Sequence, residues 1–525
     1  MHLDSGTNAT AATTTKLRTG ESKCPQSGMC VTCLDGCPGF CEIARSAVRG
    51  KELLYPKPFG KTTSAGQKKY SVDYSHLNIM GTAVGAVGIE PDPDKAIFPA
   101  VDLTTSLGAN GDLPLRFPVV VPAMGSTDVA ANNWEHLAAG VALAGAGIVI
   151  GENVCAMDPN VEIKNGRIVS SPNMEARVRA FQDWYNGAGF IGVQANVEDT
   201  RLGVQEYCID KLGVEVVEIK WGQGAKDIGG EVKVSSLERA LELKKRGYIV
   251  LPDPEDPAVR EAFEEGAIRE FERHSRIGMV EWETFIERVK ALRRAGAKYI
   301  FLKTGAYRPA DLARAVKFAS DAKLDLLTVD GAGGGTGMSP WRMMNEWGIP
   351  TLYLQSLLTQ YCDRLAAKGA YIPPVCIAGG LTLEDHMFKG FALSAPYVKA
   401  IGMARSPLAA AMVAKTVGES IKRGRVLPEY QAYGNRVERV FILGTELKAR
   451  LGSDFDRLPV GAIGVYTYFE RLAQGLRQFM CGARKFALRY ITRDDLVALT
   501  PEAAKITGLK YVMDADAEEV DRILG

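Results

Sequence analysis

The sequence lacks the features that would place the protein in a membrane or on nucleic acid. None of its 525 residues falls in an apolar run of about 18 or more, the length that spans a bilayer, so we expect no membrane insertion. The 63 lysines and arginines are balanced by 62 aspartates and glutamates, which gives no support for nucleic-acid binding. Residues 1–22 lack the apolar core of a signal peptide, so we expect a disordered arm on a cytoplasmic protein.

Histidine is missing from residues 23–60, where the cysteines gather. The stretch "CPQSGMCVTCLDGCPGFC" holds five of the ten cysteines: Cys24, Cys30, Cys33, Cys37 and Cys41. In a cytosolic protein such crowding indicates a metal site before a disulfide framework, and iron–sulfur clusters and structural zinc both take four such ligands. The missing histidine, the Cys-Pro pair and the lack of paired C-x2-C knuckles favour a 4Fe–4S cluster over zinc. Five unrelated thiols are a further alternative, and the spacing leaves open which cysteine is not a ligand.

Short segments rich in Val, Ile and Leu alternate with amphipathic helical patterns from residue 116 to residue 420. About eight such units predict an α/β fold with a parallel sheet buried on both faces and closed into a (β/α)8 TIM barrel. An open doubly wound sheet is the alternative. Proline and glycine interrupt residues 61–115, which we expect to be a connecting segment. We expect residues 421–525 to form a helical extension that packs on the barrel.

Glycine and polar residues collect where the predicted strands end. In a TIM barrel these ends share one face, which carries the chemistry, and the loops after the last two strands often bind phosphate through backbone N–H groups. The most glycine-rich end, "VDGAGGGTGMSP", matches neither the G-x-G-x-x-G fingerprint nor a P-loop, so we reject both motifs. The candidate ligand-binding residues at these strand ends, which the family resemblance described next assigns to a cofactor, are Gly125, Ser126, Gln223, Lys226, Lys303, Asp330, Gly331, Gly333, Gly334, Gly335, Thr336, Gly379, Gly380, Gly402 and Met403.

Several loop sequences are close to those of one known family. "VDGAGGGTGMSP" resembles that family's "GHDGGTGASP", and "EIKWGQGAKDIGGEVKV" resembles its "QIKIAQGAKPGEGGQLPG". Further similar stretches follow in the same order from Phe117 to Glu419, and the helical tail resembles the end of the same domain. The chain thus resembles the FMN-binding domain of the glutamate synthase large subunit, in its short archaeal and anaerobe type without a glutaminase domain. The resemblance implies a TIM barrel that binds FMN.

The resemblance also implies roles for the residues that match the family's motifs. Lys303 matches a barrel lysine, which we expect at the N1/C2 carbonyl edge of the flavin, because the reduced cofactor is anionic there. Backbone amides near Gly379–Gly380 and Gly402–Met403 would cradle the FMN phosphate. The glycines that follow Asp330 would let the backbone approach the flavin.

The sequence departs from the family mainly where the substrate binds. In "GVQANVEDTRLGV", Arg201 is retained as a carboxylate clamp for 2-oxoglutarate but the family's lysine is lost. "GENV" keeps Glu152 without the neighbouring glycines of the family's "GEGG". Gln223 and Lys226 match polar positions that contact flavin or substrate, or that only order their loop. The family's cluster motif, close to "CHLNTCPVG", is absent after the last strand, so we expect the N-terminal cysteines to replace it.

These observations predict an FMN- and iron–sulfur-dependent oxidoreductase similar to glutamate synthase, which reductively aminates 2-oxoglutarate. We expect Lys303 at the flavin, Arg201 at the substrate carboxylate and Glu152 at the amine or its proton. Electrons would come from a redox subunit or a ferredoxin, ammonia from solution or a separate subunit, and we expect an oligomer. One alternative is a flavin and iron–sulfur electron-transfer subunit, or an oxidoreductase for another substrate. A third hypothesis is a barrel with a structural zinc ribbon that binds a protein partner.

Overall fold

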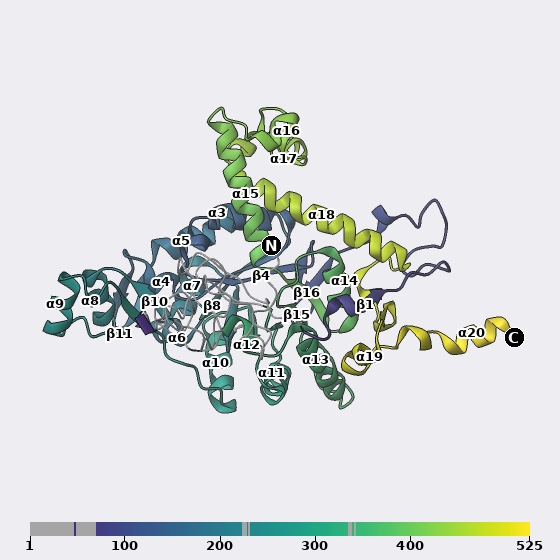
Figure 1. The fold of residues 1–525 in the computed structure, drawn as a ribbon, viewed down its shortest axis with the longest axis horizontal. Coiled ribbons are helices and arrows are strands. Elements are labelled where there is room, and N and C mark those ends of the chain that lie inside the picture. The colour runs from purple at the N-terminus through teal and green to yellow at the C-terminus, as the bar shows by residue number, and fades with distance from the viewer. Residues whose placement is uncertain (1–46, 49–69, 223–227, 229–230, 334–338, 341–342) are drawn as a thin grey trace, which may run out of the picture. The chain divides into compact units, whose positions relative to one another are not determined.

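Eight parallel strands close into a barrel in the computed structural model of this chain (Figure 1). Each strand pairs with its neighbour in the chain's order, and the last pairs with the first, where Ile401 and Gly402 lie opposite Val119 and Val120. The closed sheet confirms the (β/α)8 TIM barrel and excludes the open doubly wound alternative. The strands are β4 (Val119–Met124), β5 (Gly147–Ile150), β8 (Phe190–Ala195), β9 (Val216–Lys220), β13 (Tyr299–Thr304), β14 (Leu326–Asp330), β15 (Val375–Ala378) and β16 (Val398–Gly402).

The structure describes residues 47–48, 70–222, 228, 231–333, 339–340 and 343–525, and it divides into two units. The barrel unit comprises Val72–Trp221, Val280–Gly331 and Ile349–Gly525. The insert unit comprises Met1–Ser71, Gly222–Met279 and Ala332–Gly348. The five N-terminal cysteines, with the predicted arm and nearly all of the predicted Cys-rich segment, lie outside the described residues. In the part of the chain that is described, no helix is long and apolar enough to cross a membrane.

A helix follows every barrel strand, as the alternating sequence pattern predicts. Prolines at the first helical turn and side-chain caps help to start some of them; Ser171, for example, accepts a hydrogen bond from the Met174 amide ahead of Pro172. The eight helices are α3 (Trp134–Ala144), α5 (Pro172–Gln182), α7 (Val204–Leu212), α10 (Trp282–Arg294), α11 (Pro309–Asp321), α13 (Thr351–Ala366), α14 (Glu384–Leu393) and α15 (Arg405–Lys422).

The inside of the barrel changes from apolar to charged along the strands. Phe190 and Phe301 meet edge to face at its centre, with ring centroids 5.3 Å apart. The hairpin of β2 (Thr105–Leu107) and β3 (Leu113–Leu115) adds its leucines to the same core and lies at the N-terminal end of the strands. Residues two apart on a strand face the same side, so the inward face of β13 runs from Phe301 to Lys303. The apolar core is thus followed by charged groups at the C-terminal ends.

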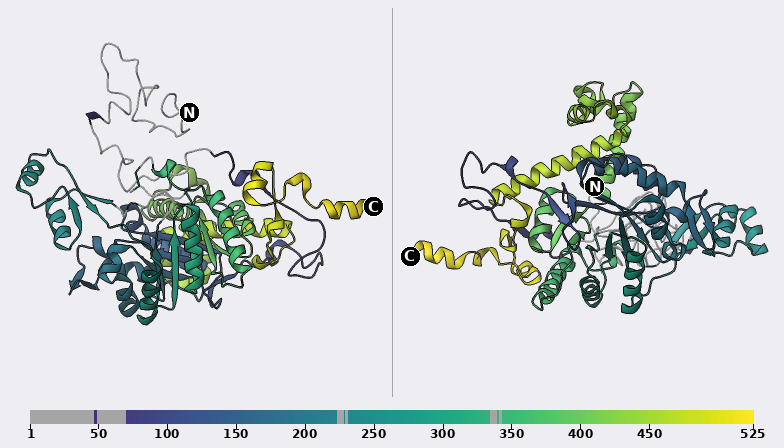
Figure 2. Two further views of the ribbon diagram at one scale, coloured as in Figure 1. Left: turned by 90° about the horizontal axis from the view of Figure 1, so that it is seen from below. Right: turned by 180° about the vertical axis from the view of Figure 1, so that it is seen from behind.

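The C-terminal extension packs on the barrel through the long helix α18 (Val460–Gly482), which lies along α3 and α15 (Figure 1; Figure 2, right). Small residues allow this approach: a Cβ on Gly464 would lie 2.2 Å from the Ala414 Cβ, and one on Gly140 would lie 2.5 Å from the Val465 Cβ. The extension also contains α16 (Val437–Val440), α17 (Gly444–Leu451), α19 (Pro501–Thr507) and α20 (Ala517–Leu524). The predicted connecting segment joins it, because β1 (Leu77–Ile79) pairs with β17 (Leu496–Ala498).

The insert unit contains a small antiparallel sheet that the sequence pattern did not reveal. Its strands are ordered β10 (Glu231–Val234), β12 (Phe271–His274) and β11 (Ile249–Leu251). The helices α8 (Leu237–Lys245) and α9 (Pro257–Glu264) connect them, and α12 (Met343–Glu346) belongs to the same unit. The charged stretch 252–276, which we interpret from sequence as a solvated helical face, therefore contains a helix and also the central strand of a sheet.

Replacing Gly464 by alanine should destabilise the protein, although alanine normally favours a helix. The added methyl group would meet Ala414 on α15, so we expect the free energy of unfolding to fall by about 1–3 kcal/mol, as for other overpacked contacts. Gly482 is the matched control, because it ends the same helix and nothing lies within 4 Å of an added Cβ. Gly482→Ala should leave stability unchanged or raise it by up to about 1 kcal/mol. Urea denaturation measures both, and equal effects would contradict the close approach.

Candidate active site

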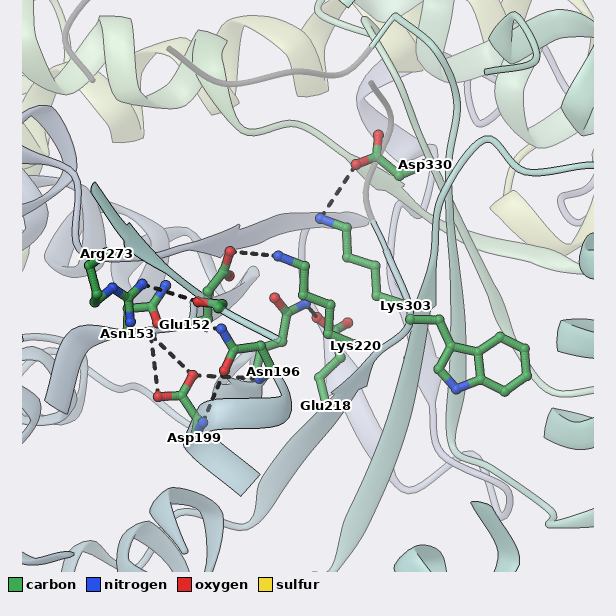
Figure 3. Close-up of polar contacts among 12 residues, drawn as sticks. Glu152, Asn153, Asn196, Asp199, Glu218, Lys220, Arg273, Lys303 and Asp330 are labelled. Atoms are coloured by element: carbon green, nitrogen blue, oxygen red, sulfur yellow. Dashed lines mark hydrogen bonds and ion pairs between the residues drawn. The ribbon is translucent and has the colours of Figure 1, made fainter. Parts of the chain in front are cut away.

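A buried lysine forms the centre of the charged layer at the barrel mouth. Lys303, at the end of β13, is only 3 % exposed, and its Nζ lies 3.4 Å from Oδ2 of Asp330 at the end of β14 (Figure 3). Burial acts to lower the pKa of Lys303, but the carboxylates of Asp330, Glu218 and Glu152 outweigh it, so the pKa lies above its ordinary value. Lys303 therefore remains a cation although it is almost completely removed from solvent.

Glu218 lies on β9 beside this lysine and is buried on the same inward face. The Gln194 side chain donates a hydrogen bond of 2.5 Å to Oε1 of Glu218. Burial raises the pKa of Glu218, while Lys303, Gln194 and Lys220 act in the opposite direction without cancelling the rise. The barrel thus contains a carboxyl group that holds a proton more readily than an exposed glutamate does.

Glu152 is held at the mouth by an ion pair and by the loop that carries it. Its Oε1 lies 2.5 Å from Nζ of Lys220, at the end of β9 (Figure 3). The next residue, Asn153, has a φ of +66°, and its amide donates a 3.0 Å hydrogen bond to Asp199. Asparagine tolerates this left-handed conformation better than most residues. The loss of the family's glycines after Glu152 is therefore compatible with a tight turn.

Arg201, the predicted carboxylate clamp, does not join the cluster of Glu152 and Lys303. It lies near the end of α6 (Val197–Leu202), its side chain is 54 % exposed, and its Nη1 lies 3.4 Å from Oε2 of Glu198. Asn196, which starts the same helix, turns toward Asn153 and donates a 3.3 Å hydrogen bond to it. In the described structure, no hydrogen bond or ion pair joins Arg201 to Glu152 or Lys303. The structure brings Glu152 and Lys303 together but leaves Arg201 out of the cluster.

Arg177 supports the first strand end and was not found by sequence reasoning. It extends from α5 and donates hydrogen bonds of 3.0 Å to the Gly125 carbonyl and 3.3 Å to the Met124 carbonyl. Its guanidinium lies 4.9 Å from the ring centroid of Trp134, and burial lowers its pKa to about 10. Arg177 thus fixes the loop of Gly125 and the half-buried Ser126. The sequence signal that could have identified Arg177 is its position as a basic residue on the buried face of an amphipathic helix.

Several glycines at the strand ends are required by the packing of the barrel itself. A Cβ on Gly331 would lie 2.2 Å from Oγ1 of Thr351, the first residue of α13. The same hydroxyl donates a 2.7 Å hydrogen bond to the Gly379 carbonyl, and Gly379 has a φ of +124°. A Cβ on Gly402 would lie 2.6 Å from that of Ala378. Packing alone therefore requires glycine at these positions, whether or not a ligand binds there.

Other predicted residues cannot be placed in the cluster. Gly333 is described and half-buried, and it belongs to the insert unit. Outside the described residues lie Gln223, Lys226, Gly334, Gly335, Thr336, Cys24, Cys30, Cys33, Cys37 and Cys41. Among the residues that are described, no group of three or more His, Cys, Asp or Glu side chains could hold a metal ion. The iron–sulfur cluster and its ligands stay a prediction.

The loops after the seventh and eighth strands offer groups suited to an anion. Gly380 follows Gly379 after β15, has a φ of +96° and is exposed. The Met403 amide donates to the Val120 carbonyl at 3.0 Å, so it belongs to the barrel closure instead of a phosphate cradle. The next turn begins α15, an 18-residue helix without a side-chain cap, whose first residue is Arg405. A helix N-terminus presents N–H groups and a partial positive charge, and the Arg405 side chain adds a full one.

Comparison with known proteins supports the resemblance over part of the chain. Residues 270–414 match the family model described as "Conserved region in glutamate synthase". This range contains Lys303, Asp330, Gly379 and Gly402, and it ends within α15. It does not include Glu152 or Arg201, whose assignment depends on the loop resemblance alone. The short type without a glutaminase domain also stays a prediction.

Solved structures give a more distant likeness. A flavocytochrome b2 double mutant with sulfite bound is 13 % identical, with a TM-score of 0.45, over 81 % of this chain and 76 % of that one. An active mutant of (S)-mandelate dehydrogenase is 14 % identical, with a TM-score of 0.41, over 81 % of this chain and 88 % of that one. A comparison with curated protein sequences finds no match.

Replacing Glu218 by glutamine should change how stability depends on pH. Burial raises the pKa of Glu218, so above the ordinary glutamate pKa of about 4.3 and up to the raised value, the folded protein binds more protons than the unfolded chain. The free energy of unfolding of the wild type therefore falls as pH rises through this window, and Glu218→Gln lacks this contribution. Urea denaturation at several pH values should show the variant gaining stability over the wild type as pH rises.

Glu215 provides the control for this measurement, because it precedes the same strand and its side chain is 62 % exposed. Glu215→Gln reports the effect of losing one carboxylate outside the barrel. A stability difference between the wild type and Glu218→Gln that stays constant across the pH series would contradict a proton held by Glu218.

Proposed function

We propose that this chain is an FMN-dependent oxidoreductase similar to glutamate synthases, with the flavin at the C-terminal mouth of the barrel. The observation that carries the proposal is the buried Lys303–Asp330 pair, which lies at that mouth and within residues 270–414, the range that matches glutamate synthase. A buried cation at a barrel mouth suits a cofactor that becomes anionic on reduction.

The described residues fit such a cofactor at two places. Gly380, the uncapped start of α15 and Arg405 supply the groups that a phosphate needs: a left-handed backbone, helix N–H groups and a cation. Burial lowers the pKa of Arg405, and the nearby carboxylate of Asp330 partly offsets this effect. The phosphate-binding groups and Lys303 are therefore on the same side of the barrel, both near Asp330. Bound FMN would supply one- or two-electron transfer.

The protein's own residues then have separable tasks. Lys303 would hold positive charge at the flavin's N1/C2 edge, and Asp330 keeps that ammonium group in place from the next strand. Glu218 would take up a proton there more readily than an exposed carboxylate, because burial raises its pKa. The Glu152–Lys220 pair would orient a polar substrate or move a proton to or from it.

The complete reaction that we propose is the reductive amination of a 2-oxo acid. 2-Oxoglutarate, ammonia, two electrons and two protons give glutamate and water. A redox subunit or a ferredoxin would supply the electrons through a cluster on four of the cysteines Cys24, Cys30, Cys33, Cys37 and Cys41. Ammonia would come from solution or from a separate subunit.

A second function is favoured by one observation about the substrate side. Arg201 is more than half exposed and pairs with Glu198, so it does not serve as the expected carboxylate clamp beside Glu152. Glu152 itself is paired with Lys220. These contacts favour a flavin and iron–sulfur electron-transfer subunit, or an oxidoreductase for a substrate other than 2-oxoglutarate.

Replacing Lys303 by methionine should weaken FMN binding by about ten- to a hundredfold, the effect of losing one charge-assisted contact. The flavin's reduction potential should fall as well, because the reduced anion loses its cation. Fluorescence titration with FMN and a redox titration measure the two effects. Lys317→Met, an exposed lysine on α11, is the control, and Lys303→Arg shows whether charge alone restores binding. Affinity and potential like those of the wild type in Lys303→Met would remove Lys303 from the flavin site.

Anaerobic turnover distinguishes the two functions. The protein is first analysed for iron and acid-labile sulfide, since zinc without sulfide would contradict the proposed electron relay. The flavin is then reduced chemically, and 2-oxoglutarate is added with ammonium. Flavin reoxidation with an equal amount of glutamate is expected for the synthase. A reduced flavin that stays reduced under these conditions, but is oxidised by a ferredoxin, would overturn the synthase and support the electron-transfer function.

A further inference from the structure

A cavity lies at the opposite end of the barrel from Lys303. Its volume is about 490 Å³. Its walls are formed by the β2–β3 hairpin, the start of β16 and the segment around the 3₁₀ helix η7 (Leu488–Tyr490). All of these belong to the barrel unit. Since β16 runs from Val398 to Gly402 and its C-terminal end reaches the mouth, a cavity at its start is on the other face of the barrel.

The charged residues that line this cavity are all basic. Lys399, Arg116 and Arg489 face it, and none of its lining residues is an aspartate or a glutamate. None of the three makes an ion pair with a carboxylate in the described structure. Arg116 donates a 3.0 Å hydrogen bond to the neutral Asn186 side chain, and Arg489 lies over the Tyr490 ring, 4.7 Å from its centroid. Arg116 also lines a neighbouring cavity that contains Asp183 and Asp454, and it interacts at a distance with Glu470.

Lys399 is the unusual member of this group. Lys399 is the extra residue where the pairing of β16 with β15 shifts register, between Val398 and Ala400. Its side chain is half-buried and lines the cavity. Its ammonium group makes no hydrogen bond with any described residue. Burial alone lowers the pKa of Lys399, and no carboxylate offsets it. A partly desolvated ammonium group without an acidic partner is unfavourable unless something else supplies the negative charge.

The rest of the lining suits the remainder of an organic molecule. Thr105 and Ser106 carry hydroxyl groups that are not engaged in any described hydrogen bond, and both line the cavity. Apolar side chains complete the wall, among them Phe391, Val398 and Leu488. A cavity with apolar walls and a few converging polar groups is the usual form of a small-molecule site.

We propose that this cavity is a second binding site, which takes an organic anion: a phosphate or carboxylate group joined to an apolar body. The anionic group would lie against Lys399, with Arg116 and Arg489 at the rim and the two hydroxyls as further donors. The apolar body would cover Phe391 and Val398. The site does not depend on the proposed flavin chemistry, because it shares no residue with the barrel mouth.

Calorimetric titration of the full chain with phenyl phosphate tests this site. The protein is first loaded with FMN and then freed of the excess, so that the phosphate ester cannot report the barrel mouth and free FMN cannot compete for the cavity. We expect saturable binding by the wild type, with weaker binding of inorganic phosphate, which lacks the ring, and of benzyl alcohol, which lacks the charge. Lys399→Met keeps the apolar stem and should lose about tenfold in affinity, whereas Lys399→Arg should retain binding.

Two controls keep the outcome interpretable. Lys368→Met removes an exposed lysine that does not line the cavity and should bind like the wild type. Thermal melting checks that Lys399→Met is folded. An absence of saturable binding to the wild type, equal affinity in Lys399→Met, or equal binding of benzyl alcohol or inorganic phosphate would overturn the proposal. Failure of FMN to bind would count against the flavin site alone, since dependence on Lys399 would still identify the cavity.

Discussion

The arrangement at the barrel mouth depends on burying the ammonium group of Lys303. Removing one charge from water costs several kcal/mol unless a partner of opposite charge is fixed beside it. The closed barrel meets this requirement by placing Asp330 on the neighbouring strand, 3.4 Å away, and Glu218 on the strand at the other side. Glu218 comes from β9, Lys303 from β13 and Asp330 from β14, so these contacts exist only when the three strands are in register. Closing the barrel in register is therefore also what assembles the charged groups at its mouth.

The glycines at the strand ends follow from this constraint as well. For charged side chains to meet above the core, the strand ends must approach one another closely. Gly331 and Gly379 lie against Thr351, and Gly125 lies against the Glu152 carbonyl, with no room for a methyl group at any of the three. This gives a more specific reason for these glycines than clearance for a cofactor does. Because they keep side chains away from the rim, the backbone groups that remain are also the ones available to a ligand.

The sequence was sufficient for the barrel, because its strands are apolar at nearly every position and the eight helices follow in strict alternation. It was also sufficient to place Lys303 and Asp330 at the barrel mouth, because they are charged residues at the ends of apolar strands. Their role at a flavin stays a prediction. Local pattern could not reveal the Glu152–Lys220 pair, since its members are 68 residues apart. The sequence alone could not show where Arg201 points: it lies one helical turn after Glu198 on α6 and pairs with it, so it lies outside the cluster of Lys303. The sheet of the insert unit was missed because its strands carry charges, as in Lys233 between Glu231 and Glu272.

Lys303, which is buried, and Lys399, which is half-buried, differ in how their charge is balanced. Three carboxylates raise the pKa of Lys303 against the effect of burial, so its charge is balanced by the protein alone. Burial acts on Lys399 with no carboxylate to offset it, and two arginines line the same cavity. The same barrel places carboxylates beside Lys303, so the fold itself does not prevent such pairing at Lys399. No carboxylate lines the cavity of Lys399, and an anionic ligand would balance the positive charge there.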